Sequence, residues 1–246
     1  MMNAYIYGRH AVLALLKAEP QRVHRLYVSV TAEPEFKPIG QRFHIPVEPL
    51  AGHKFDQELE GAVHQGVIAK VAIEGLMKDY NRFMSSFSPS PDIALVLLNE
   101  ITDPHNVGAI IRSAAAFGAA GVLIPTHNQA TITGVVAKAS AGAVFTVPII
   151  AISNENQVIL DLKKRGYWIY GLAGEGSNEL PNEKFDAPAV FVVGSEGEGL
   201  RAKTREHCDI LLRIPMHSSV ESLNASVSAA VVLSRWSSQH PKALKL

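Results

Sequence analysis

The chain has 246 residues, of which 47% are hydrophobic and 19% are charged, and its 23 basic side chains balance 23 acidic ones. This composition predicts a folded protein with one or two cores and excludes a disordered, highly charged chain. The balanced charge excludes a strongly basic protein, so nucleic-acid binding would have to use local patches. No apolar run approaches the roughly 20 residues that span a bilayer, and we expect no membrane segment.

The cysteine and histidine content narrows the class further. A single cysteine, Cys208, excludes an internal disulfide and a cysteine-rich zinc site. The ten histidines show no zinc-like pairing with cysteine or carboxylates, so we expect no metal. The N-terminus, MMNAYIYGRHAVLALLK, does not match a secretory signal because its apolar run is short. These features together predict a cytoplasmic protein.

The N-terminal part of the chain predicts a small α/β unit over residues 1–74. Residues 8–19 place apolar side chains at helical spacing, whereas 25–30 and 66–73 are typical of strands. The polar tract at 75–92 contains prolines and serines without a clear period, and it predicts an extended linker.

From residue 93 to residue 246, apolar runs alternate with helical candidates. This alternation predicts an α/β domain whose mainly parallel sheet is covered by helices on both faces. Ligands in such sheets bind beyond the carboxyl ends of the strands, which makes the loops after the strands candidate sites. The expected strands are 93–98, 121–124, 145–150, 167–172, 189–194 and 210–214.

The loop after 93–98 begins NEITDPHNVGAIIRS. Its Asp-Pro pair predicts a turn, and Asn106 is a good N-cap for the helix that follows. Arg112 lies six residues further along this apolar helix. A capping asparagine and a surface arginine are the simplest interpretation of each residue alone. A buried arginine, however, would require an anion or a carboxylate as its partner.

The loop after 189–194, GSEGEGLRAKTREHCD, admits several interpretations. A dinucleotide motif would require an acidic residue about 20 positions on, and none is present there. A nucleophile elbow at Ser195 would require glycine where valine stands. In the third interpretation the glycines let the backbone approach a ligand, and Glu196 pairs with Arg112. Plain turn glycines beside a solvated glutamate remain an alternative.

The loop after 210–214 continues as IPMHSSVESLNASVSAAVVL into the final helix. Ser222 and Asn224 lie where side-chain oxygens cap free helix amides, which is the simplest role for Ser222. Three polar loops at neighbouring strand ends nevertheless predict one shared site.

Three segments, DPHNVGAIIRSAAAFG, FVVGSEGEGL and IPMHSSVESLNASVSAAVVL, resemble in order and spacing the signature motifs of the SpoU (TrmH-like) branch of the SPOUT RNA methyltransferases. The N-terminal unit, including GAVHQGVIA at 61–69, resembles the ribosomal-protein-L30e-like substrate-binding domain of bacterial 23S rRNA guanosine 2'-O-methyltransferases. One departure is Asn99-Glu100, where relatives often carry Asp followed by a small residue.

The resemblance implies a SPOUT domain over 93–246 with a trefoil knot, an L30e-like domain over 1–74 and a homodimer. It implies S-adenosylmethionine as cofactor and, as substrate, a guanosine ribose of 23S rRNA in the peptidyl-transferase-centre region. The catalytic set that it implies is Arg112, Asn106, Glu196, Ser222 and Asn224. The cofactor slot that it implies is Gly194, Ile214 and Leu223, with Ala173 and Gly174 beside them.

The chemistry that the resemblance implies centres on Arg112. A ribose 2'-hydroxyl is a poor nucleophile, so it must be aligned with the methyl donor and stabilised as its proton leaves. A guanidinium stays protonated in proteins, which argues against a general base. We expect Arg112 to clamp the target phosphate and to stabilise the developing alkoxide, while the proton passes to phosphate or water.

In the N-terminal unit, His64 and Gln65 beside Gly66 form a candidate RNA contact, because glycine allows close approach of a nucleotide. A simple turn before a strand is the alternative. Residues 1–74 carry eight basic and eight acidic side chains, so RNA binding there would rely on patches, shape and histidines. Alternative functions are a tRNA guanosine 2'-O-methyltransferase, or a non-enzymatic RNA-binding or ribosome-assembly protein. The presence of the whole implied catalytic set argues against a non-enzymatic role.

Overall fold

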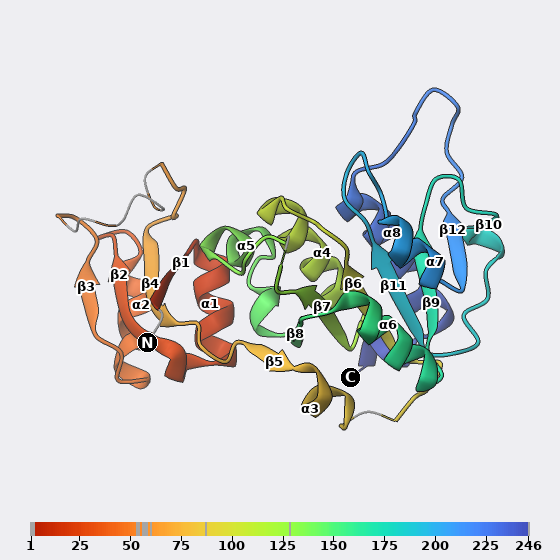
Figure 1. The fold of residues 1–246 in the computed structure, drawn as a ribbon. Helices are drawn as coiled ribbons and strands as arrows, with labels where there is room; N and C mark the ends of the chain where they lie inside the picture. The colour runs from red at the N-terminus through yellow and green to blue at the C-terminus, as the bar shows by residue number, and fades with distance from the viewer. Residues whose placement is uncertain are drawn as a thin grey trace. The chain divides into compact units, whose positions relative to one another are not determined.

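The computed structural model describes residues 3–52, 55, 59, 61–86, 88–127 and 129–245, and the chain divides into two compact α/β units (Figure 1). Unit 1 comprises Met1–Leu76 and Ile132–Thr146, and unit 2 comprises Met77–Thr131 and Val147–Leu246. The chain therefore enters unit 1 twice. No helix in these described ranges is long and apolar enough to cross a membrane.

Unit 1 is built on a four-stranded sheet of order β1-β4-β2-β3, in which β4 runs antiparallel to β1 and β2 and β3 runs parallel to β2. The strands are β1 (Asn3–Tyr7), β2 (Val23–Val28), β3 (Val47–Pro49) and β4 (Val67–Ala72). The helices are α1 (Arg9–Ala18), α2 (Glu33–Arg42), α5 (Gly134–Ala139) and the 3-10 turns Pro20–Arg22 and Ala143–Phe145.

The predicted helix and strands of unit 1 are present, with shifted ends. Helix α1 buries Val12, Leu15 and Leu16, which follow the helical spacing of the sequence. The strand expected at 25–30 is β2, which begins and ends two residues earlier. The short strand β3 was not predicted, because three residues are too few to show an alternation.

A segment from much later in the chain completes unit 1. Helix α5 lies against β1, and a Cβ on Gly134 would overlap the carbonyl oxygen of Tyr5. Val135 packs on the apolar cluster that contains Tyr7 and Ile68. The sequence predicts a C-terminal domain that includes 132–146, whereas the structure groups this segment with unit 1. The reason is steric, because a glycine at 134 lets the helix approach the strand backbone.

Unit 2 contains an eight-stranded sheet of order β10-β12-β9-β11-β6-β7-β8-β5, and every pairing among its described strands is parallel. The strands are β5 (Met77–Asp79), β6 (Ala94–Leu98), β7 (Gly121–Pro125), β8 (Ile149–Ile152), β9 (Trp168–Leu172), β10 (Asn178–Glu179), β11 (Ala189–Val193) and β12 (Ile210–Arg213). The helices are α3 (Tyr80–Met84), α4 (Pro104–Ala116), α6 (Glu155–Lys164), α7 (Ala202–His207), α8 (Ala225–Gln239) and the 3-10 turns Leu180–Asn182 and Ala243–Lys245. The predicted mainly parallel sheet is confirmed.

Helices cover both faces of this sheet (Figure 1). Val190 and Val192 of β11 pack in one apolar cluster with Ile159 of α6. Phe191, the residue between them, points to the opposite face, where its ring centroid lies 6.5 Å from that of Trp236 in α8. This alternation along one strand is the two-residue period of a sheet buried on both sides. Because all strands are parallel, their carboxyl ends meet at one edge.

Two expectations for unit 2 differ from the structure. The tract 75–92 is not an extended linker throughout, because it contains β5 and α3, and Tyr80 and Phe83 are buried in the core. These elements are too short to produce a period in the sequence. The strand expected at 145–150 starts only at Ile149, since Pro148 interrupts it and a 3-10 turn precedes it.

Candidate functional site

The three polar loops meet at the carboxyl edge of the unit 2 sheet, as predicted. Asn106 of α4 donates from Nδ2 to Glu196 Oε1 at 3.0 Å. Asn224, which precedes α8, donates from Nδ2 to Asn106 Oδ1 at 2.9 Å and also to Glu196 Oε1. Each of the three side chains comes from a different segment, so the cluster ties together the chain after β6, β11 and β12.

The first member of this cluster is not a helix cap. Asp103 is the N-cap of α4, and its Oδ1 accepts a hydrogen bond from the His105 amide at 2.8 Å. Pro104 occupies the first helical position, which its fixed φ favours. The predicted N-cap role of Asn106 is therefore wrong. The consequence is functional, because Asn106 lies inside the helix, 8% exposed, and its amide is used by Glu196 and Asn224.

Asn224 both caps a helix and belongs to the cluster. Its Oδ1 accepts from the amides of Ser226 at 2.9 Å and Val227 at 3.3 Å, which confirms capping at the start of α8. Its Nδ2 carries the bonds to Asn106 and Glu196. Because one side chain makes both sets of bonds, the orientation of α8 and the position of Glu196 are linked.

The loop of residues 194–200, which we call the glycine loop, follows β11 and closes on itself. Ser195 and Gly199 exchange two backbone hydrogen bonds of 3.1 and 3.0 Å. A Cβ on Gly194 would overlap the backbone of Gly199, so this close return requires glycine. Gly197 and Gly199 have φ of +87° and +68°, in the left-handed region.

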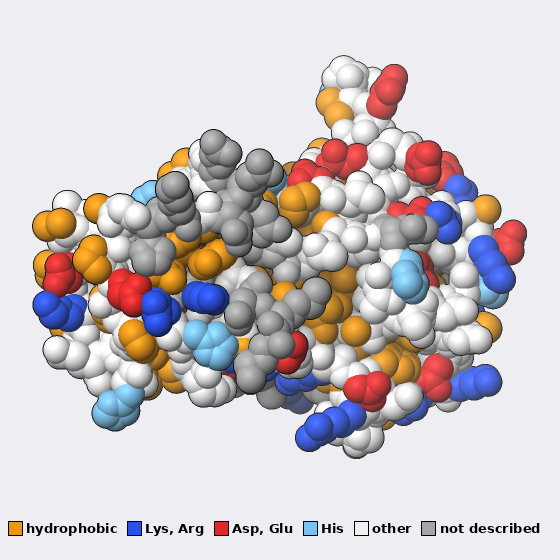
Figure 2. Space-filling view, turned by 60° about the vertical axis from the view of Figure 1, so that its left-hand side comes forward, with side chains coloured by type: hydrophobic (Ala, Val, Ile, Leu, Met, Phe, Trp, Pro, Cys, Tyr) orange, Lys and Arg blue, Asp and Glu red, His pale blue; other side chains and the backbone are white. Residues whose placement is uncertain are grey.

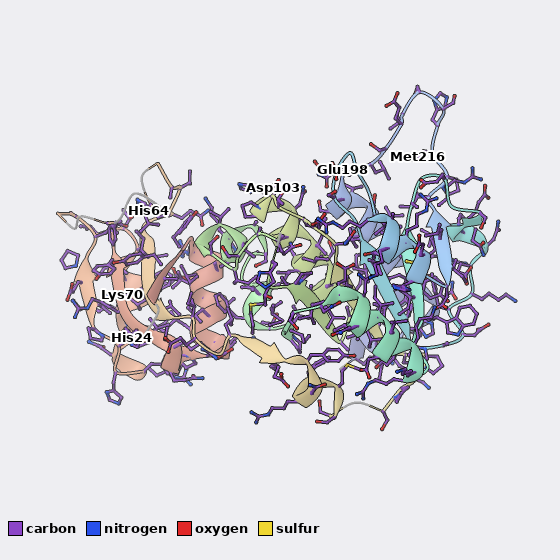
Figure 3. All side chains as sticks on the ribbon, viewed as in Figure 1. His24, His64, Lys70, Asp103, Glu198 and Met216 are labelled. Carbon is purple, nitrogen blue, oxygen red and sulfur yellow. The ribbon has the colours of Figure 1, made fainter. Side chains whose placement is uncertain are left out.

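A cavity of about 540 Å³ opens beside the glycine loop. This volume lies within the range of small-molecule sites. Figure 3 shows Glu198 and Met216, which line the cavity, at the same end of unit 2. All five residues of the expected cofactor slot line it: Ala173, Gly174, Gly194, Ile214 and Leu223. Of the expected catalytic set, Glu196, Ser222 and Asn224 line it as well.

The cavity wall also contains residues that the sequence did not single out. Apolar walls come from Leu172, Leu200, Leu212 and Met216. Glu175 and Arg205 form an ion pair and both line the cavity. Leu172 and Leu212 stand at strand ends, and Glu175 and Met216 lie three residues beyond the strands, so position after a strand is the signal that could have identified these four.

The cavity is acidic at its rim. Four glutamates line it, namely Glu175, Glu196, Glu198 and Glu221, against one arginine. Figure 2 shows acidic side chains gathered over the upper part of unit 2. A cavity of this charge favours a ligand that carries positive charge.

Arg112 is separated from the cavity cluster. It is exposed on α4, and within the described part of the chain it has no hydrogen bond or ion pair. Within this chain Glu196 does not pair with Arg112, because Glu196 binds Asn106 and Asn224. Six residues along an α-helix correspond to a rotation of about 600°, so Arg112 and Asn106 point in different directions.

The candidate RNA-binding residues of unit 1 lie in the turn before β4, where Figure 3 labels His64. His64 Nδ1 accepts from the Gly66 amide at 3.1 Å, and Gln65 Oε1 accepts from the Arg9 amide at 3.0 Å. Gln65 and Gly66 both have positive φ, of +53° and +82°. These bonds define a structural turn whose glutamine supplies the cap that Gly8 cannot give to α1.

Three chemistries find no support in the geometry of the described residues. Within the described ranges no group of three or more His, Cys, Asp or Glu could hold a metal ion. The nucleophile-elbow interpretation fails because His217 Nδ1 contacts Ser219 Oγ, at 2.8 Å, rather than Ser195. Burial raises the pKa of the Cys208 thiol to about 12, so this thiol is not ionised near neutral pH.

Comparison with protein families identifies the family to which the chain belongs. Residues 94–234 match the model of the SpoU rRNA methylase family, and residues 5–74 match the model described as RNA 2'-O ribose methyltransferase substrate binding. The chain belongs to the SpoU rRNA methylase family. The family model covers all three polar loops, and the substrate-binding model covers the first segment of unit 1 except its ends.

Individual relatives agree along nearly the whole chain. The 23S rRNA (guanosine-2'-O-)-methyltransferase RlmB of Pseudomonas putida is 39% identical over 233 residues, which are 93% of each chain. The RlmB of Haemophilus influenzae is 37% identical over 237 residues, which are 94% of this chain and 96% of its own. A solved RNA 2'-O ribose methyltransferase shares the fold with a TM-score of 0.72 and 25% identity, over 97% of this chain and 89% of its own. The SpoU methyltransferase AviRb of Streptomyces viridochromogenes, solved with AdoMet, gives a TM-score of 0.81 at 22% identity, over 98% of this chain and 91% of its own, which shows the fold alone.

Proposed function

We propose that this chain methylates the 2'-hydroxyl of a guanosine ribose in 23S rRNA, with S-adenosylmethionine as methyl donor. The observation that carries the proposal is the cavity at the carboxyl edge of the sheet, where the expected cofactor slot and the Asn106–Glu196–Asn224 cluster adjoin each other. The relatives named as 23S rRNA guanosine methyltransferases match both units, which supports rRNA as the substrate. Such a substrate places the activity in the cytoplasm.

The cavity fits the proposed cofactor in size, polarity and charge. Leu172, Ile214 and Leu223 offer an apolar wall for adenine, and the glycine loop offers backbone groups to its edge. The glutamates at the rim suit the positive charge of a sulfonium and an α-amino group. When bound, S-adenosylmethionine supplies an electrophilic methyl group.

The protein's own part of the chemistry is alignment and charge stabilisation. The Asn106–Glu196–Asn224 cluster lies where it can orient the ribose beside the cavity. Arg112, permanently cationic and without a protein partner in the described ranges, is available to the RNA phosphate and to the developing alkoxide. The ribose proton passes to phosphate or water. Ser222 lines the same cavity and has no separate role assigned by a contact.

A homodimer formed through unit 2 would bring Arg112 of one subunit to the site of the other subunit. Helices α4 and α8 pack together, and the outer side of α8 exposes Val227 and Val231, 45% and 37% accessible. Burial of such side chains favours association. In this arrangement Arg112, which does not reach its own cluster, completes the partner's site.

The trefoil knot of the family is part of the same proposal, and the position of β12 beside β9, away from β11, supports it.

The decisive experiment maps ribose methylation in RNA from cells with and without the protein, and repeats the reaction with purified protein and S-adenosylmethionine. We expect one guanosine of 23S rRNA to lose its methyl group in cells without the protein and to regain it in vitro. Loss of a tRNA methyl group instead would establish the tRNA enzyme. RNA binding without methyl transfer and without calorimetric binding of S-adenosylmethionine would establish a non-enzymatic role. Light scattering at micromolar concentration that shows only monomer would contradict the dimer.

A further inference from the structure

One buried residue, Asn99, joins both ends of the glycine loop through its backbone and its side chain. Asn99 follows β6 and is 1% exposed. Its backbone amide donates to the carbonyl oxygen of Val193 at 2.8 Å, immediately before the loop. Its side-chain Oδ1 accepts from the amide of Arg201 at 3.0 Å, immediately after the loop. All seven residues between these two contacts line the cavity.

The orientation of the Asn99 amide is fixed by two further residues. Its Nδ2 donates to Glu155 Oε1 at 3.0 Å and to Oε2 at 2.9 Å, and Thr204 Oγ1 donates to Glu155 Oε1 at 2.9 Å. The Arg201 amide can only donate, so the amide oxygen of Asn99 must face it, and the amide nitrogen then requires an acceptor. Glu155 is that acceptor. The donors and acceptors of the network can therefore be arranged in only one way, with the chain of hydrogen bonds ending at a carboxylate.

The network is too buried to tolerate an unsatisfied member. Thr204 is 2% exposed, and burial raises the pKa of Glu155. A buried polar group that loses its partner costs more than the bond itself contributes. Glu100 reinforces the same end of the loop through an ion pair with the Arg201 guanidinium. Neither Glu155 nor Thr204 lines the cavity, and the hydrogen bonds of Asn99 connect Glu155 to the end of the glycine loop.

We propose that Asn99 is a positioning residue for cofactor binding, and that Glu155 and Thr204 hold its amide in the orientation that keeps the glycine loop closed. The identity of the ligand rests on the proposed function, whereas the clamp on the loop does not. An aspartate at this position would place a carboxylate against Glu155 and could not donate to it. In this chain the amide is therefore required by its partner.

An exchange of amide and carboxylate tests the proposal. Asn99→Asp should weaken S-adenosylmethionine binding, measured by calorimetry, by about tenfold to a hundredfold. Adding Glu155→Gln should restore binding to within roughly threefold of wild type, because glutamine can donate to the new aspartate with the polarity reversed. Asn154→Asp is the matched control. It makes the same change one residue from Glu155, at a helix N-cap where aspartate caps equally well, and should bind as wild type does.

Hydrogen exchange of the glycine-loop amides gives a readout that needs no ligand. Asn99→Asp should speed exchange at residues 194–200, where the Ser195 and Gly199 amides are bonded, and the double variant should slow it again. If Asn99→Asp does not fold, Thr204→Val replaces it and should weaken binding several-fold. Wild-type affinity in Asn99→Asp, or a double variant no better than the single one, would overturn the proposal. Exchange that changes as expected in a protein that never binds S-adenosylmethionine would instead contradict the proposed cofactor.

Discussion

Two glycine-containing turns, one in each unit, look alike in the sequence but differ in what their polar groups do. The turn at 63–66 in unit 1 and the glycine loop at 194–200 in unit 2 both place polar side chains beside glycines of positive φ. In the turn, His64 and Gln65 bond to backbone amides of unit 1 itself. In the glycine loop, Glu196 bonds to side chains of two other loops and lines a cavity.

The comparison shows which observation separates a site from a turn. A polar side chain near a glycine predicts either one, because the conformational need for glycine is the same in both. The distinction comes from the partners of the polar atoms and from the presence of a cavity. By this criterion, mutations in the glycine loop should change ligand binding, whereas mutations in the 63–66 turn should change stability.

The largest expected effect is on methyl transfer, when Arg112 is replaced. Arg112→Ala should lower methyl transfer by at least about a hundredfold, because removal of one charge-stabilising donor has this magnitude. Affinity for S-adenosylmethionine should stay within about twofold of wild type, since Arg112 does not line the cavity. Arg165→Ala is the control, because Arg165 pairs with Asp161 on the surface and should retain activity. An active Arg112→Ala protein would contradict the assigned role.

The next largest effect is expected at Gly194, where the glycine loop folds back against its own backbone. Gly194→Ala would drive a methyl group into the backbone of Gly199, which cannot rotate away. The loop would have to open, so binding of S-adenosylmethionine, measured by calorimetry, should fall by about tenfold or more. Binding equal to wild type would show that the glycine loop does not form the ligand wall.

The sequence predicts the sheet of unit 2 well because its strands are buried on both sides. Apolar runs such as 189–194 therefore stand out against polar loops, and the observed β11 lies inside this run. The short elements β5 and α3 were missed, since three to five residues cannot display a period. The return of 132–146 to unit 1 depends on contacts across the chain and has no local signal.

The candidate site, like the fold, has features that the sequence predicts and features that it does not. Motif order was sufficient to place five residues on one cavity wall, because parallel strands bring their carboxyl ends together. It could not predict the partners of individual atoms. Pro104 moves the cap to Asp103 and frees Asn106, and helical rotation turns Arg112 away from Glu196. The clamp at Asn99 was visible only as a departure from the family pattern.

A smaller effect is expected at Gln65, in the unit 1 turn. Gln65→Ala should lower the free energy of unfolding by about 1 kcal/mol, because α1 loses the acceptor for its Arg9 amide. If His64 and Gln65 served RNA binding alone, their joint replacement would leave stability unchanged, so urea denaturation decides between the two roles. Gln65→Glu keeps an acceptor oxygen and should stay near wild-type stability. RNA affinity that falls in both variants while stability is unchanged would return this turn to a binding role.

The smallest effect is a pH dependence at Glu155, beneath the glycine loop. Burial, the largest cause, raises the pKa of Glu155 above 4.5, whereas the hydrogen bonds from Asn99 and Thr204 oppose the rise. The charges of Glu100, which raises this pKa, and of Arg201, which lowers it, have smaller effects. In the pH range between 4.5 and the raised pKa, the folded state binds more protons than the unfolded state, so stability falls as the pH rises. Glu155→Gln removes this titration, and so the wild-type protein should lose stability relative to Glu155→Gln across that range and stay parallel to it at higher pH. The slopes of unfolding free energy against pH are compared, because the substitution also changes the absolute stability. A wild-type protein that gains relative stability over that range would show that Glu155 is stabilised as a carboxylate, and that its bonds to Asn99 and Thr204 outweigh its burial.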